Sequence, residues 1–179
     1  FVQIGSNPSP EVPSVVFNQR AGTMMAVQHL VDLGHRKIVE IKGMQNLYDG
    51  RARHQAYLEV MHANHLQPGV SLDGEFSTAG GYERGHELVT RGIDFTAVFC
   101  ANDLNASGLV HALDECGIRV PGDVSVVGFD DQRGVEHMIP PLTTVRQDPC
   151  LSYSRALQYL IDLMANPDLP HQRHVLAPN

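Results

Sequence analysis

The sequence predicts an α/β fold in which parallel strands form a doubly wound sheet. Short apolar or β-branched runs alternate with amphipathic helical stretches along most of the chain. Two runs, TAVFCA (96–101) and VSVVGF (124–129), are apolar almost throughout, which is typical of strands buried on both faces. Glycines follow several of the helical stretches, as left-handed helix caps do. Strands and helices that alternate in this way form parallel sheets with right-handed crossovers.

The first predicted unit is a strand over 14–17 followed by a helix over 19–33. Met24, Val27 and Val31 fall on one face of that helix, and Gly34 caps it. The other predicted elements are, in chain order, strand 37–42, helix 49–64, strand 74–76, helix 78–91, strand 96–101, helix 102–116, strand 124–129, strand 143–146, helix 151–165 and an extended piece over 174–177. The segment 131–141 has no predicted element.

The composition limits the kinds of partner that this chain is expected to bind. Its 179 residues carry a net charge of −7, with only 13 Lys and Arg. Because phosphate binding needs clustered cations, we expect this segment not to grip nucleic acid itself. No run approaches the 18 apolar residues of a transmembrane helix, and the first ten residues lack the basic and apolar regions of a signal peptide. The chain starts with Phe1, so we expect the natural N-terminus to lie upstream.

The cysteines and histidines indicate no redox or metal chemistry. Cys100, Cys116 and Cys150 are odd in number and stand in apolar stretches, which favours reduced structural thiols and a cytoplasmic protein. Two histidine pairs, 62/65 and 171/174, have no further ligand at metal-binding spacing. Sequence motifs of hydrolases, P-loop proteins, dinucleotide-binding proteins and zinc proteases do not occur. We therefore expect no cofactor, no metal and no catalysis.

Polar residues gather where the predicted strands end. In open parallel sheets, ligands bind beyond the carboxyl ends of the strands. The residues at these positions are Arg51 and Arg53 beyond KIVEIK, Asn102 and Asp103 after TAVFCA, Asp130 and Asp131 after VSVVGF, and Arg146, Gln147 and Asp148 after TTV. Together with Phe76 as an apolar wall, carboxylate, amide and guanidinium groups suit a polyhydroxylated ligand.

Each of these residues also has a purely structural interpretation. Asn102 can serve only as a helix N-cap, and one of the two adjacent aspartates can serve only in a turn. An isolated helical arginine such as Arg53 is usually solvated, and a lone Phe76 is more often part of a core.

Several strings together resemble the LacI/GalR family of sugar- and nucleoside-responsive repressors. The most specific are GIRVPGDVSVVGFDD (117–131) and PPLTTVRQD (140–148). The supporting strings are Ala21-Gly22 with HLVDLGHRKI (29–38), RARHQAY (51–57), TAVFCANDLNASG (96–108) and Gly81-Tyr82. The resemblance covers residues 14 to 165.

The resemblance implies two similar α/β lobes of the periplasmic-binding-protein-like type, which are joined by three crossover strands and close on a small effector. Residues 1–17 would end the first lobe, 18–141 form the second lobe, and 142–179 cross over and return to the first. A helix-turn-helix head would precede them. The effector contacts of the family fall on Arg53, Phe76, Asn102, Asp130 and Gln147. One departure is Asn18-Gln19, where the family usually has Asp-Asn; the other is that most first-lobe contacts are absent.

The resemblance therefore implies the effector-binding domain of a DNA-binding transcription repressor. We expect a sugar, or a nucleoside or purine, as its effector, and operator DNA to be bound only through the head. The alternative is the sugar-binding protein of a transport system. We also expect a two-fold homodimer, in which the apolar patch His137, Met138 and Ile139 takes part. The other interpretation of this patch is that Met138 and Ile139 simply cover the sheet edge.

Overall fold

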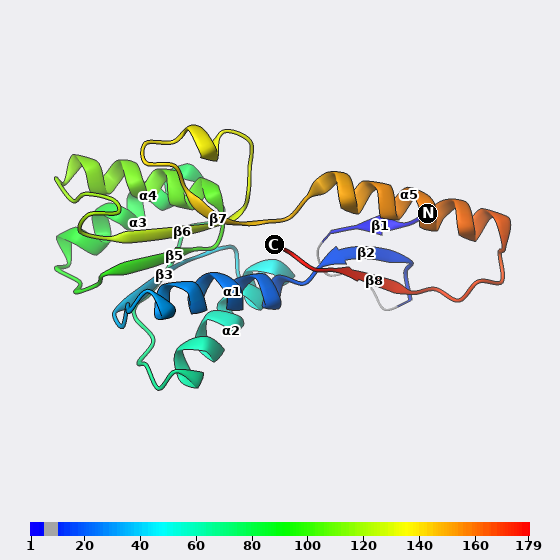
Figure 1. Ribbon diagram of the computed structural model, residues 1–179, viewed down its shortest axis with the longest axis horizontal. Helices are drawn as coiled ribbons and strands as arrows, with labels where there is room; N and C mark the ends of the chain where they lie inside the picture. Colours follow the sequence, from blue (N-terminus) through cyan, green and yellow to red (C-terminus); the bar gives the residue numbers. More distant parts are fainter. Residues whose placement is uncertain (6–10) are drawn as a thin grey trace.

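A computed structural model describes residues 1–5 and 11–179 of the chain, so residues 6–10 of the expected first-lobe segment 1–17 lie outside the described part. The chain forms two parallel sheets that lie side by side along the long axis of the molecule (Figure 1). The larger sheet has five strands in the order β4-β3-β5-β6-β7, and the smaller has three in the order β1-β2-β8. This is the α/β architecture with parallel sheets that the alternating pattern predicted.

Helices cover both faces of the larger sheet (Figure 1). Helices α1 and α2 cover one face, and helices α3 and α4 cover the other. The strands are β3 (Ile38–Lys42), β4 (Ser71–Asp73), β5 (Ala97–Cys100), β6 (Ser125–Asp130) and β7 (Thr143–Arg146). The helices are α1 (Gln19–Asp32), α2 (Tyr48–Ala63), α3 (Thr78–Thr90) and α4 (Asp103–Glu115).

The core of this unit lies against both faces of its central strand. Every residue of β5 is buried, as the apolar run predicted. Phe99 packs toward α1 and α2 with Val27, whereas Cys100 packs toward α3 and α4 with Leu109. Helices α3 and α4 can approach closely because Gly108 has no side chain. A Cβ atom at this position would lie only 2.0 Å from the Thr78 carbonyl oxygen.

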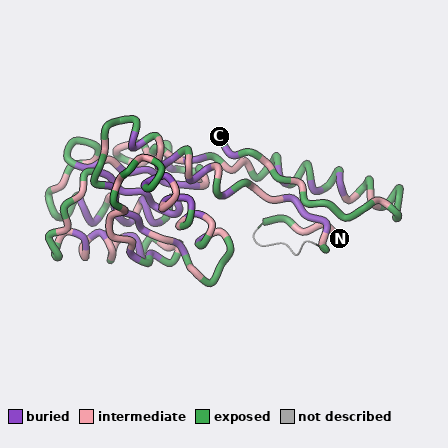
Figure 2. Tube along the Cα trace, turned by 90° about the horizontal axis from the view of Figure 1, so that it is seen from below, coloured by how far each residue is buried: buried purple, intermediate pink, exposed green. Residues whose placement is uncertain are grey.

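The smaller sheet consists of β1 (Gln3–Ile4), β2 (Ser14–Phe17) and β8 (Arg173–Leu176), with α5 (Pro149–Ala165) packed on β1 and β2. Much of this arm is exposed, in contrast to the buried body of the larger unit (Figure 2). The chain passes between the two sheets three times: after β2, after β7 and after β8 (Figure 1). Two of these passages are paired, because Arg146 and Asn179 exchange backbone hydrogen bonds.

Two expectations from the sequence were wrong in detail. The strand expected over 74–76 lies instead at Ser71–Asp73, and Glu75 and Phe76 have left-handed backbone conformations that cannot continue a strand. Of the three thiols expected in apolar surroundings, Cys100 is buried, but Cys116 and Cys150 are exposed. The unassigned segment contains one turn of 3-10 helix, η1 (Val135–His137).

The other boundaries agree with the prediction to within two residues, and glycines 34, 92 and 117 have the positive φ angles expected of helix caps. Among the described helices, none combines the length and the apolar character that crossing a bilayer requires.

Candidate functional site

The guanidinium group of Arg53 lies at the centre of the polar cluster at the carboxyl ends of the strands. Arg53 belongs to α2 and is only 4% exposed. Its Nε donates to Gln19 Oε1 at 3.0 Å, its Nη1 donates to the Ala101 carbonyl oxygen, and its Nη2 donates to Asp130 Oδ1 at 3.0 Å. The guanidinium carbon lies 3.8 Å from the centroid of the Phe129 ring. Arg53 is therefore not the solvated helical arginine of the structural interpretation.

Asp130 ends β6 in an unusual backbone conformation. Its φ angle is +106°, and that of Asp131 is +56°. Burial raises the pKa of the Asp130 carboxyl above its usual value, although the neighbouring Arg53 acts in the opposite direction. The side chain keeps 27% of its surface exposed. Non-glycine residues with positive φ are costly and cluster at ligand sites, so this strand end has a feature typical of a binding site.

Asn102 and Phe76 are joined by a hydrogen bond, and the Phe76 ring lies near Arg53. The Asn102 side chain caps α4 by accepting from the Asn105 N–H at 2.9 Å, and its Nδ2 donates to the Phe76 carbonyl oxygen at 3.1 Å. The centroid of the Phe76 ring lies 5.6 Å from the Arg53 guanidinium carbon. A Cβ atom at Gly43 would lie 2.0 Å from the Phe76 ring, so only glycine at the end of β3 admits the ring in this position. The predicted capping role of Asn102 is confirmed.

Gln147 reaches the cluster through a residue outside the predicted set. Its Nε2 donates to Gln19 Oε1 at 2.9 Å, and the same oxygen accepts from Arg53. Gln19 is the first residue of α1 and is 7% exposed. All five predicted residues thus belong to one connected network. The signal for Gln19 in the sequence was its place at the start of a helix just beyond β2, comparable to that of Asn102 beyond β5.

Asp103 is a second polar residue that was noted in the sequence but left out of the predicted site. It is 2% exposed and accepts from Thr144 Oγ1 at 2.5 Å and from the Gln132 N–H at 2.7 Å. Glycine at position 128 permits this approach, because a Cβ atom there would lie 2.3 Å from Asp103 Oδ1. Burial raises the pKa of the Asp103 carboxyl to about 6, against the two hydrogen bonds, which lower it. Asp103 thereby fixes the turn that follows Asp130.

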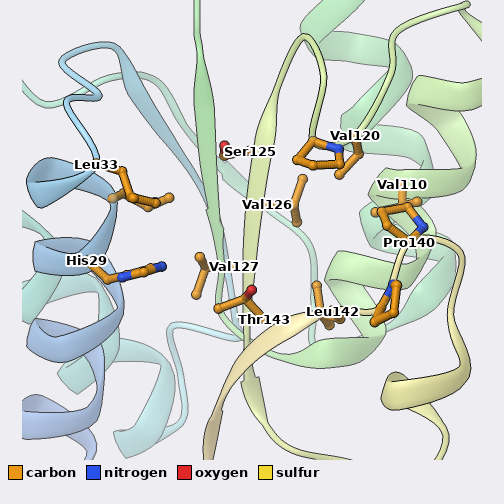
Figure 3. Close-up of a pocket in the computed structure, with 13 residues that line it drawn as sticks. His29, Leu33, Val110, Val120, Ser125, Val126, Val127, Pro140, Leu142 and Thr143 are labelled. Atoms are coloured by element: carbon orange, nitrogen blue, oxygen red, sulfur yellow. The ribbon is translucent and has the colours of Figure 1, made fainter.

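A polar hollow of about 600 Å³ opens beside this network, and Asp130 and Gln147 are among the residues that line it. A smaller, apolar hollow of about 180 Å³ lies at the opposite, amino ends of β6 and β7. Figure 3 shows His29 and Leu33 of α1 on one side of these strands, and Val110 and Pro140 on the other. None of the predicted site residues lines the apolar hollow, so the polar end of the sheet is the candidate ligand site. Within the part of the chain described, no three His, Cys, Asp or Glu side chains are placed to hold a metal ion.

Comparison with known proteins identifies the family. The family model described as "Periplasmic binding protein-like domain" matches residues 27–179, which is most of the chain. The chain belongs to this family. The fold with its two parallel sheets and the ligand-type residues at the strand ends agree with that assignment.

The curated relatives are bacterial repressors. The chain is 35% identical over 178 residues to the lactose operon repressor of Escherichia coli (strain K12), which covers 94% of this chain and 49% of that protein. It is 36% identical over 136 residues to the HTH-type transcriptional repressor PurR of Serratia proteamaculans (strain 568), which covers 75% of this chain and 40% of that protein. The resemblance to LacI/GalR regulators is thus confirmed. The chain spans about half the length of these relatives or less, and the relatives are repressors and not enzymes.

Solved structures of such regulators have the same fold. A dimeric Lac repressor with a C-terminal deletion matches with a TM-score of 0.91 at 30% identity, over 99% of this chain and 65% of that one. A complex of the transcriptional regulator CelR with cellobiose matches with a TM-score of 0.89 at 32% identity, over 99% of this chain and 56% of that one. The chain therefore has the fold of the effector-binding domain of LacI-family regulators.

The raised pKa of Asp103 predicts a specific dependence of stability on pH. Unfolded Asp titrates near 3.9, so between about pH 4 and pH 6 the folded protein holds a proton that the unfolded chain has lost. The stabilisation is therefore complete below about pH 4 and is lost as the pH rises through 6. Asp103→Asn keeps the shape and cannot titrate, so the wild type should lose roughly 2–3 kcal/mol relative to this variant between pH 4 and pH 7.5. Urea unfolding at both pH values measures the difference.

The control for this experiment is Asp114→Asn, which removes an exposed carboxyl from the same helix. If the wild type and Asp103→Asn differ in unfolding free energy by the same amount at both pH values, the carboxyl is not titrating in this range.

Proposed function

We propose that this chain is the effector-binding domain of a DNA-binding transcription repressor, and that its effector is a sugar bound at the Arg53 network. One observation carries the proposal. Arg53, Phe76, Asn102, Asp130 and Gln147 form one connected group at the carboxyl ends of the strands, beside a hollow of about 600 Å³. Relatives of this chain are repressors, and the CelR structure holds cellobiose.

The chemistry of the group suits a polyhydroxylated ligand. The exposed part of the Asp130 carboxylate can accept hydrogen bonds from sugar hydroxyls, and the arginine and amide N–H groups can donate to sugar oxygens. The Phe76 ring offers an apolar face for sugar C–H groups. A nucleoside or purine is the second candidate, since the Phe76 ring can equally stack on a base.

The layout of the whole protein follows from the same proposal. The first lobe would end in residues 1–17, the second would comprise 18–141, and 142–179 would cross back, so that the ligand lies between the lobes. A helix-turn-helix head outside this chain would bind operator DNA, in the cytoplasm. The repressor would be a homodimer, like the dimeric Lac repressor with a C-terminal deletion.

The assignment of ligand contacts predicts two weakened variants. Asp130→Asn removes the charged acceptor. Arg53→Lys replaces the planar guanidinium by one ammonium group, which cannot reach the three separate acceptors around Arg53. In the intact protein each should weaken sugar binding by about 2 kcal/mol, because a polar partner in the cleft is left unpaired. The sugar for the measurement is the one of ribose, galactose, lactose and cellobiose that raises the melting temperature of the protein most. Calorimetry then measures the affinity of each variant for this sugar. Arg51→Lys, on the exposed side of the same helix, should bind like the wild type. Wild-type affinity in both site variants would refute the site assignment.

The proposed dimer predicts a variant that dissociates. Ile139 is 94% exposed in the loop after η1. An apolar side chain in such a place stabilises the protein only when a partner surface covers it. Ile139→Glu should therefore shift the intact protein toward monomer in analytical ultracentrifugation. Met25→Glu, on the exposed face of α1, is the control. A dimer that persists in Ile139→Glu would exclude this patch from the interface.

The repressor proposal itself is tested by linkage. A DNA site is first selected from a random pool with the intact protein, and its affinity is then measured with and without the stabilising sugar. An effector that changes DNA affinity must have its own affinity changed by DNA by the same factor, typically about 1–3 kcal/mol. Selection of no DNA, or equal affinities in both titrations, would favour the alternative, a sugar-binding protein of a transport system.

A further inference from the structure

We propose that Gln19 is a positioning residue of the ligand site, which orients Arg53 and Gln147 for binding. The inference rests on the proposed function, because it concerns how that site is held ready. Its basis is one atom: Gln19 Oε1 accepts from Arg53 Nε at 3.0 Å and from Gln147 Nε2 at 2.9 Å.

The backbone fixes Gln19 before its side chain makes either bond. It is the residue at which the chain, after leaving β2, starts α1, and the preceding Asn18 caps that helix by accepting from the Ala21 N–H at 3.0 Å. Gln19 is 7% exposed, so its amide has little freedom to reorient. A buried carbonyl oxygen at a fixed helix start is a rigid acceptor.

The two donors come from different parts of the fold. Arg53 belongs to α2, whereas Gln147 follows β7 at the passage to α5. Gln19 itself follows the passage from β2, so its oxygen links two of the three passages between the sheets to the body of the larger unit. Loss of this oxygen would free Gln147 to rotate, and would leave the Arg53 Nε–H without its acceptor.

Arg53 shows why such a fixed acceptor matters. Its two terminal nitrogens donate to the Ala101 carbonyl oxygen, which directly follows β5, and to Asp130 at the end of the neighbouring strand β6. These two bonds alone leave the guanidinium able to tilt about the line between them. The Phe129 ring limits that tilt on one face, and the Nε bond to Gln19 fixes it within the plane. Since a guanidinium recognises ligand oxygens through its plane, the tilt decides which ligands fit.

The test compares three variants of the intact protein. Gln19→Met has a similar size and no acceptor, and should bind the best sugar of the ribose, galactose, lactose and cellobiose panel about tenfold more weakly. Gln19→Glu keeps an acceptor for both donors and should stay within about threefold of the wild type. Gln28→Met is the matched control: it lies on the same helix and also loses an accepted hydrogen bond, from Asn64 Nδ2, but is remote from the site. It should bind like the wild type.

A second measurement does not depend on any ligand. With ¹⁵N-arginine labelling, the Arg53 Nε–H should exchange slowly with solvent in the wild type and in Gln19→Glu, and quickly in Gln19→Met. If no sugar of the panel binds the wild type, the proposed sugar function fails, and the exchange rates still decide the positioning role. Unchanged affinity or unchanged exchange in Gln19→Met would overturn the inference, as would an equal loss of affinity in Gln28→Met or in Gln19→Glu.

Discussion

The rest of the site depends on one constraint: a guanidinium charge that is almost wholly buried needs an acceptor at each of its three nitrogens. An unpaired buried charge costs several kcal/mol, so the fold has to deliver an acceptor to each nitrogen of Arg53. It does so from three elements, with Gln19 at the start of α1, the Ala101 carbonyl oxygen after β5 and Asp130 at the end of β6. The ring of Phe129 covers one face of the guanidinium plane. Helix α2 is thereby tied to the carboxyl edge of the sheet, where the proposed ligand would lie.

Those parts of the fold that depend on local pattern were predictable from the sequence. A strand buried on both faces, such as β5, must be apolar throughout, and a helix that ends in a left-handed residue favours glycine, as at Gly34. The strand at 71–73 was missed because it is short and only Leu72 in it is buried, so it has no apolar run to mark it. The expected strand at 74–76 failed because the left-handed conformation of Phe76 is imposed by tertiary contacts, namely the space that Gly43 leaves and the bond from Asn102.

The sequence predicts which residues belong to the candidate site better than it predicts the contacts between them. Strand-end geometry alone selects Arg53, Asn102, Asp130 and Gln147, because all parallel strands end at one edge. It does not reveal that Arg53 and Asp130 pair with each other, since that bond joins residues 77 positions apart. Nor does it separate Gln19 from ordinary helix-start residues. Such information lies in the packing of α1 against α2, which no local pattern encodes.

The pairing within the site bears on how it would bind a ligand. Arg53 has five N–H groups, and three of them are engaged by the protein, so the guanidinium is held in place and keeps donors for a ligand. Asp130 gives one oxygen to Arg53 and remains partly exposed. A ligand would therefore add hydrogen bonds to an ordered network, and would not have to break an ion pair first. Since ordering side chains on binding costs about 0.5–1.5 kcal/mol each, a network ordered in advance leaves more of the contact energy to appear as affinity. The strained backbone at Asp130 is part of the same arrangement, because it places the carboxylate where both Arg53 and the hollow can reach it.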